Sequence, residues 1–267
     1  MKYLLVNDPH LDIRAPSFRR TDDYMATALG KLAQIADLCQ VLEADVLCCT
    51  GDWFHKKNPQ AVPHRLVRAL LEWSHYVTDT VGIPIYTILG NHDVQFNDMS
   101  PSSVQKQPVG TLLTNSKVFW LDQHGPLTIK GVTFVGTSFQ PPVERDGKMV
   151  EDPAQFATPA ELSGPVVQLT HASVVPEKPM WEPYTLVSDL AEYSRATVCH
   201  TGHIHEDLGI HRVTRQDGSV FHWTNIGSMT RGSLNESTLE RKPSRRGWIQ
   251  SSLRSSCSTS GLRKSTT

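Results

Sequence analysis

The chain has 267 residues, of which 39% are apolar, and this is enough for one large hydrophobic core. A formal net charge of −1 excludes a generally cationic coat for nucleic acid. Seven of the 26 basic residues and none of the 27 acidic ones lie in residues 241–267, which leaves 19 basic against 27 acidic residues, or −8, for residues 1–240. The acidic body suits a protein that binds cations.

The cysteines are odd in number, lack CxxC spacing and lie mostly in apolar runs, which predicts reduced thiols in the core. No apolar run approaches the roughly 18 residues needed to span a bilayer. The apolar segment before Asn7 is also too short for a signal peptide. We therefore expect a cytoplasmic protein with no membrane association.

The first part of the chain predicts a βαβ unit. Residues 1–6 form an apolar strand, and residues 13–23 form a polar loop in which Thr21 or Asp22 is expected to cap the next helix. Apolar residues recur at spacings of three and four over 23–42, which predicts an amphipathic helix. A strand over 45–50 follows, and the two strands should lie parallel in one sheet.

The next elements in order are a helix over 61–79, a strand over 83–89 and a long polar loop over 94–116. Strands are expected at 118–121, 127–129 and 132–138, the last two forming a hairpin. Residues 139–165 hold five prolines and should form a surface excursion.

Strands over 166–170 and 196–201 come next, and segments 209–214 and 220–225 predict a second hairpin. Parallel strands early and hairpins late indicate an α/β fold of two packed sheets with helices outside. One domain should cover residues 1–240. Residues 241–267 are rich in serine and arginine and should form a disordered tail that is no full capping domain.

Short clusters of metal-ligand type follow five of the apolar strands, and the central one contains Asp52 after the strand that ends at Cys49. A carboxylate fixed at a strand's C-terminal edge is available to ligands, and Gly51 allows the sharp turn. The other clusters are Asn7-Asp8-Pro9-His10, Gly90-Asn91-His92-Asp93, Thr170-His171-Ala172 and Gly202-His203-Ile204-His205.

These clusters predict a site for two divalent metal ions. Each cluster alone is weak, and a lone His171 is more often an ordinary core or surface histidine. Carboxylate, amide and imidazole ligands without a thiolate suit Mn, Mg, Fe, Zn or Co. Asp52 is the natural bridge, because one carboxylate can hold two cations about 3.5 to 4 Å apart. Asp93 is expected to orient its neighbours through hydrogen bonds.

The ordered motifs from Asp8 to His205 resemble those of the calcineurin-like metallophosphoesterase superfamily over about three quarters of the chain. The resemblance implies a four-layer α/β/β/α sandwich. It also implies that His92 protonates the leaving oxygen. One metal would be held by Asp8, His10, Asp52 and His205, and the other by Asp52, Asn91, His171 and His203.

Within the superfamily, Gly51-Asp52-Trp53-Phe54-His55 and Asp8-Pro9-His10-Leu11 resemble motifs of DNA double-strand-break repair nucleases of the SbcD type. The resemblance implies that His55 is a second active-site histidine, and that Arg231 lies in a stretch that closes the core and approaches the site. Lys56 and Lys57 are candidate phosphate contacts, with solvated surface charge as the alternative.

The leading hypothesis is a metal-dependent DNA exonuclease or endonuclease of repair or recombination, with Mn as the expected ion. The alternatives are a small-molecule or cyclic-nucleotide phosphodiesterase or phosphatase, and a scaffold without activity. The resemblance implies DNA as substrate and an SMC-like ATPase subunit as partner. The residues after Arg231, however, resemble neither the capping domain nor the docking segment of those nucleases. A homodimer through the 61–79 helix would also be usual in that group.

Overall fold

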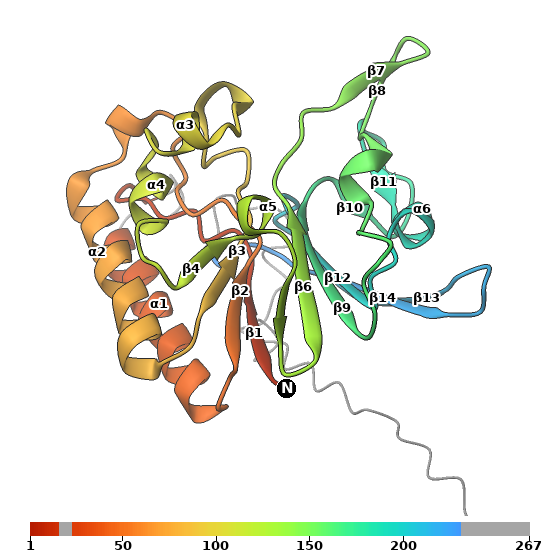
Figure 1. The fold of residues 1–267 in the computed structure, drawn as a ribbon. Coiled ribbons are helices and arrows are strands. Elements are labelled where there is room, and N and C mark those ends of the chain that lie inside the picture. The colour runs from red at the N-terminus through yellow and green to blue at the C-terminus, as the bar shows by residue number, and fades with distance from the viewer. Residues whose placement is uncertain (16–22, 231–267) are drawn as a thin grey trace, which may run out of the picture.

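The protein, described here by a computed structural model over residues 1–15 and 23–230, is built from two β-sheets packed face to face between helices (Figure 1). Side chains of both sheets meet in one buried cluster, in which Leu5 and Tyr86 come from the first sheet and Phe134 and Leu169 from the second. The predicted α/β/β/α sandwich is confirmed.

The first sheet is entirely parallel in the order β1-β2-β3-β4. Its strands are β1 (Tyr3–Val6), β2 (Val46–Cys49), β3 (Ile85–Thr87) and β4 (Val118–Trp120). Alternate residues point to opposite faces, so Leu4 packs on the helices while Leu5 packs on the second sheet. Burial on both faces explains why these strands are continuous apolar runs in the sequence.

Two helices, α1 (Tyr24–Val41) and α2 (His64–His75), cover the outer face of this sheet (Figure 1). The expected extent of α1 is confirmed, but Asp23 caps it, accepting the backbone N–H of Ala26 at 3.1 Å, so the expected cap at Thr21 or Asp22 is wrong. The single helix expected over 61–79 divides into η1 (Pro59–Ala61), α2 and a π-helical turn η2 (Tyr76–Val81).

The second sheet is mixed, in the order β13-β14-β12-β9-β6-β5. Its strands are β5 (Leu127–Ile129), β6 (Val132–Thr137), β9 (Val166–His171), β12 (Val198–Gly202), β13 (Asp207–Thr214) and β14 (Val220–Ile226). The four inner strands are parallel, whereas β5 and β13 pair antiparallel at the edges. Both predicted hairpins are therefore confirmed.

The outer face of the second sheet is covered by a short unit that the sequence did not reveal. It comprises β10 (Val174–Val175), β11 (Thr185–Leu186) and α6 (Val187–Tyr193), which lie beyond the sheet in Figure 1. Leu190 and Ala191 of α6 are fully buried against Trp223 and Phe221 of β14.

The loops near the carboxyl ends of the strands carry more structure than expected. Residues 94–116, predicted as a loop, contain η3 (Gln95–Asn97), α3 (Pro101–Val104) and α4 (Pro108–Leu112), and a short α5 (Leu121–His124) follows β4. The excursion over 139–165 holds a hairpin, β7 (Val143–Arg145) with β8 (Lys148–Val150), and η4 (Pro153–Phe156). The hairpin projects from the body of the molecule (Figure 1).

Cys39, Cys48, Cys49 and Cys199 are buried free thiols, and burial raises the pKa of each. Their predicted place in the core is confirmed, while Cys257 and the tail over 241–267 lie outside the described residues. Among helices of the described part of the chain, none is both long and apolar enough to cross a membrane.

His200, expected to be structural, links the two sheets and gives the fold a testable sensitivity to acid. Its Nε2 lies 2.7 Å from the Tyr3 hydroxyl of β1, and its Nδ1 lies 2.6 Å from Thr224 Oγ1. Burial lowers the pKa of His200 to about 3, from an ordinary value of 6.5. Below about pH 6.5 the unfolded chain therefore binds a proton that the folded protein does not.

The contribution of neutral His200 to stability is complete above about pH 6.5, the ordinary pKa of histidine, and is lost as the pH falls toward 3, the pKa of His200 in the folded protein. We expect it to account for about 1.4 kcal/mol of unfolding free energy per pH unit. Urea unfolding of the metal-free protein between pH 7 and 4.5 should give a slope shallower by this amount in His200→Gln than in the wild type. Equal slopes would show that His200 is charged in the folded state.

Candidate metal centre

The predicted ligands meet at one end of the sandwich because each follows a parallel strand, and parallel strands end at the same edge. They extend from both sheets. Asp8 and His10 follow β1, Asp52 follows β2, Asn91 follows β3, His171 ends β9, and His203 and His205 follow β12.

The first group of ligands surrounds His10. The ligand atoms of Asp8, His10 and His205 all lie within 4.8 Å of one another. Nε2 of His10 lies 2.8 Å from Nε2 of His205 and 3.3 Å from Oδ2 of Asp52. Burial lowers the pKa of His10 well below its ordinary value. The imidazole is therefore neutral at pH 7, with a lone pair that a cation can use.

The second group surrounds Asn91. Its Oδ1 lies 3.1 Å from Nδ1 of His203 and 3.3 Å from Nε2 of His171. Oδ2 of Asp52 lies 3.5 Å from the same His171 nitrogen. This carboxylate oxygen is thus beside both groups, as a bridging ligand requires.

The protonation of His171 tests whether the site fits a cation. Nδ1 of His171 lies 2.7 Å from the carbonyl oxygen of Thr50, which can only accept, so Nδ1 carries a hydrogen. In neutral His171 the Nε2 lone pair then faces oxygen atoms of Asn91 and Asp52, which is repulsive unless a positive charge lies between them.

Electrostatics in the centre agree with that test. Burial acts to lower the pKa of His171, but the Asp52 and Asp8 carboxylates outweigh it and raise the pKa to about 9. Burial raises the pKa of Asp8 to about 7, whereas the pKa of Asp52 is held well below its usual range by His171 and His10 against the effect of burial. The centre favours positive charge, and its oxygen and imidazole donors fit divalent cations.

Backbone strain is concentrated in the same place. Four of the seven predicted ligands have positive φ, with values of 42° for Asp8, 45° for His10, 53° for Asp52 and 84° for His203. Such conformations cost roughly 1 to 3 kcal/mol each and persist where the surrounding structure imposes them, often at functional sites. The sequence pointed only to the turn at Gly51.

Glycines give the ligands room to approach one another. A Cβ at Gly90 would lie 2.0 Å from Oδ1 of Asp52. A Cβ at Gly202 would lie 2.5 Å from Oδ1 of Asp8 and 2.9 Å from Nδ1 of His171. Neither position can therefore take a larger side chain without displacing a predicted ligand.

Asp93 holds two of the ligand-bearing turns together, as expected. Its buried carboxylate accepts backbone N–H groups from Asp52 at 2.7 Å, Trp53 at 2.8 Å and Gly90 at 2.9 Å. Oδ1 of Asp52 in turn accepts the backbone N–H of His92 at 2.7 Å. Burial, with the nearby Asp52 charge, raises the pKa of Asp93 to about 7.

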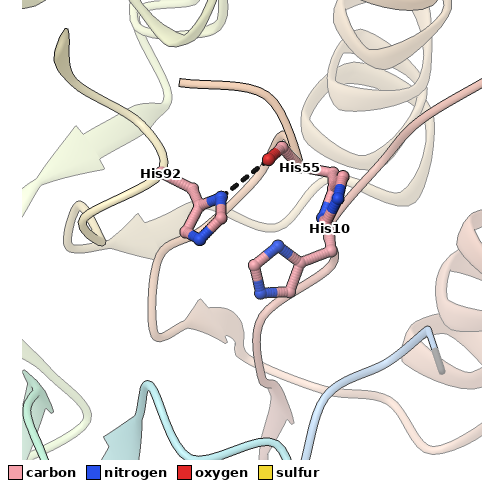
Figure 2. A group of neighbouring side chains, drawn as sticks. All are labelled: His10, His55 and His92. Carbon is pink, nitrogen blue, oxygen red and sulfur yellow. Dashed lines mark hydrogen bonds between the residues drawn. The ribbon is translucent and has the colours of Figure 1, made fainter. Parts of the chain in front are cut away.

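His92 and His55 lie at the solvent side of the centre, next to His10 (Figure 2). Nδ1 of His92 donates to the carbonyl oxygen of His55 at 2.6 Å, which leaves Nε2 of His92 for other partners. The two rings are nearly parallel, at 25° with centroids 5.7 Å apart, and the His10 ring lies 4.9 Å from that of His92. Burial, with the Lys56 charge next, lowers the pKa of His55.

The predicted phosphate contacts Lys56 and Lys57 are not brought together in the way that the predicted metal ligands are. Lys56 forms an ion pair of 3.6 Å with the buried Asp12, whereas Lys57 is exposed. Arg231 lies outside the described residues, although the stretch before it is seen closing the core. The backbone N–H of Met229 there donates to the Asn7 carbonyl at 2.8 Å.

Sequence reasoning missed two groups that shape the centre. The Thr50 carbonyl fixes the His171 ring, and Phe139 packs its ring 5.7 Å from that of His203 and 6.2 Å from that of His171. A carbonyl carries no sequence signal. Phe139 follows β6, an inner strand for which no ligand cluster was apparent.

Fold and donor set together define a metal-dependent hydrolase. The family model for calcineurin-like phosphoesterases matches residues 1–207, and the chain belongs to this family. No curated protein matches the sequence. The crystal structure of TT1561 of Thermus thermophilus is similar with a TM-score of 0.49 and 12% identity, over 84% of this chain and 89% of that one.

Gly202→Ala should weaken metal binding, because the added methyl group meets Asp8 and His171. We expect Mn²⁺ affinity, measured by isothermal titration calorimetry, to fall at least about tenfold. Gly30→Ala in α1 is the matched control, since no atom lies within 4 Å of its added Cβ. Unchanged affinity in Gly202→Ala would show that the ligands do not need this close approach.

Asp93→Asn should loosen both turns, because an amide NH₂ would face backbone N–H groups that now have an acceptor. We expect a loss of about 2 to 3 kcal/mol in unfolding free energy and a loss of Mn²⁺ affinity in the same variant. Chemical denaturation and calorimetry measure the two effects. Asp98→Asn, at an exposed position, is the control, and equal stability of the two variants would contradict the role of Asp93.

Proposed function

We propose that this chain is a two-metal phosphodiester hydrolase that cuts DNA. The observation that carries the proposal is the pair of partly exposed imidazoles, His92 and His55, beside seven converging metal-ligand side chains. In this proposal Asp8, His10, Asp52 and His205 hold one cation, and Asp52, Asn91, His171 and His203 hold the other. Mn²⁺ is the expected ion.

Bound divalent cations would lower the pKa of a water and neutralise charge on the phosphoryl group. The side chains supply the rest. The hydrogen bond from Nδ1 of His92 to the His55 carbonyl fixes the ring, and Nε2 then delivers a proton to the leaving oxygen. His55, stacked on that ring, positions the phosphate.

The contact between two motifs supports the nuclease assignment over a general phosphoesterase. Leu11, from the Asp-x-His-Leu motif, forms a β-bridge with Phe54, from the Gly-Asp-Trp-Phe-His motif. The N–H of Leu11 donates to Trp53 at 2.9 Å, and the N–H of His55 donates to Leu11 at 3.0 Å. The two segments that resemble repair nucleases thus form one structural unit, in which His55 lies next to His10.

The proposal is tested by hydrolysis of single- and double-stranded DNA with Mn²⁺, beside bis-p-nitrophenyl phosphate and cyclic nucleotides. His92→Asn should bind Mn²⁺ normally and cut DNA about 10² to 10⁴ times more slowly. It should lose less activity on bis-p-nitrophenyl phosphate, because p-nitrophenolate leaves without a proton.

Each of the other outcomes would change the proposed function or the proposed role of His92. Turnover of small diesters alone would make this a phosphodiesterase with Lys56 and Lys57 as ordinary surface charge. Metal binding without any hydrolysis would indicate a scaffold. DNA cleavage at full rate by His92→Asn would show that another group is the acid. Cytoplasmic location, a homodimer and an ATPase partner stay predictions.

A further inference from the structure

A highly exposed aromatic side chain follows the Gly90-Asn91-His92-Asp93 cluster in the sequence. Phe96 is 90% exposed, whereas the next most exposed aromatic residues of the described chain, Trp181 and Tyr193, are 45% and 43% exposed. Phe96 is four residues after His92, the proposed acid. Folding gains nothing from an aromatic ring held in water.

The backbone holds this ring outward. Phe96 and its neighbour Asn97 both have positive φ, of 58° and 54°, which is rare for a bulky side chain. Val94 before them is fully buried in the core, and Met99 after them packs against the same core cluster. A short turn fastened at both ends therefore presents Phe96 in a strained conformation that packing of its own side chain does not explain.

The charge of the protein also bears on how it would hold DNA. Residues 1–240 carry a formal net charge of −8, so beyond the metal centre a general attraction between the protein surface and phosphates contributes little affinity. An aromatic ring can supply affinity instead, because every nucleobase has a face on which it stacks. In duplex DNA those faces are covered by neighbouring bases.

We propose that Phe96 is a stacking platform for an unpaired nucleobase on the leaving-group side of the cleaved phosphate. The inference rests on the proposed nuclease function and adds a substrate class, which is single-stranded DNA or a frayed duplex end. His92 protonates the leaving oxygen, so the loop that begins at His92 is the one that meets the nucleoside leaving with it.

The test compares binding of a fluorescein-labelled dT12 with a 12-unit oligomer of baseless tetrahydrofuran spacers, by anisotropy with Mn²⁺ and the His92→Asn protein. Adding Phe96→Ala should weaken dT12 binding about tenfold and leave the baseless oligomer unaffected. Phe96→Trp should keep the preference for bases. Tyr76→Ala, which removes another exposed aromatic ring, from η2, is the matched control.

The single variants Phe96→Ala and Tyr76→Ala are then compared in hydrolysis of single-stranded DNA. If the wild type cuts DNA and Phe96→Ala binds and cuts dT12 as well as the wild type does, Phe96 is not a stacking platform, while the proposed nuclease function is retained. If the wild type neither binds nor cuts DNA but hydrolyses bis-p-nitrophenyl phosphate, the nuclease function fails and the platform fails with it. An equal loss in Tyr76→Ala would also overturn the specific role of Phe96.

Discussion

The centre depends on one buried carboxylate that binds no metal in our assignment. Asp93 accepts the N–H groups of Gly90, Asp52 and Trp53, and so joins the turn after β2 to the turn after β3. A carboxylate is suited to this task because it offers several acceptor sites and no donor. The backbone of His92 then fixes the Asp52 side chain, which lies between the two groups of predicted ligands.

The centre is assembled at a cost that the rest of the sandwich offsets. Four ligand residues have positive φ, and the buried carboxylates Asp8 and Asp52 lie close to one another in a region of low dielectric. The apolar clusters on both sides of each sheet provide the burial that compensates for this strain and repulsion. A divalent cation relieves the repulsion, so metal binding and stability are coupled.

The features that could be predicted from the sequence are those that leave a local pattern of residues. The two-sheet fold and the positions of most strands along the chain follow from apolar runs, and the candidate ligands follow because each lies where such a run ends. The positive φ of Asp8 and His10, the Thr50 carbonyl and the packing of Phe139 depend on contacts between distant segments and have no local signal. The same holds for β10 and β11, which are two residues each, and for the short helices α3 and α4.

The segment after β14 returns to the beginning of the chain. Met229 bonds to Asn7 and Thr230 Oγ1 bonds to the carbonyl of Pro9, so the first ligand turn is fastened by residues more than 200 positions later. Contacts of such sequence separation form only after both segments have been synthesised. A growing chain on the ribosome therefore cannot fasten its first ligand turn in this way until nearly all of the described residues have been synthesised.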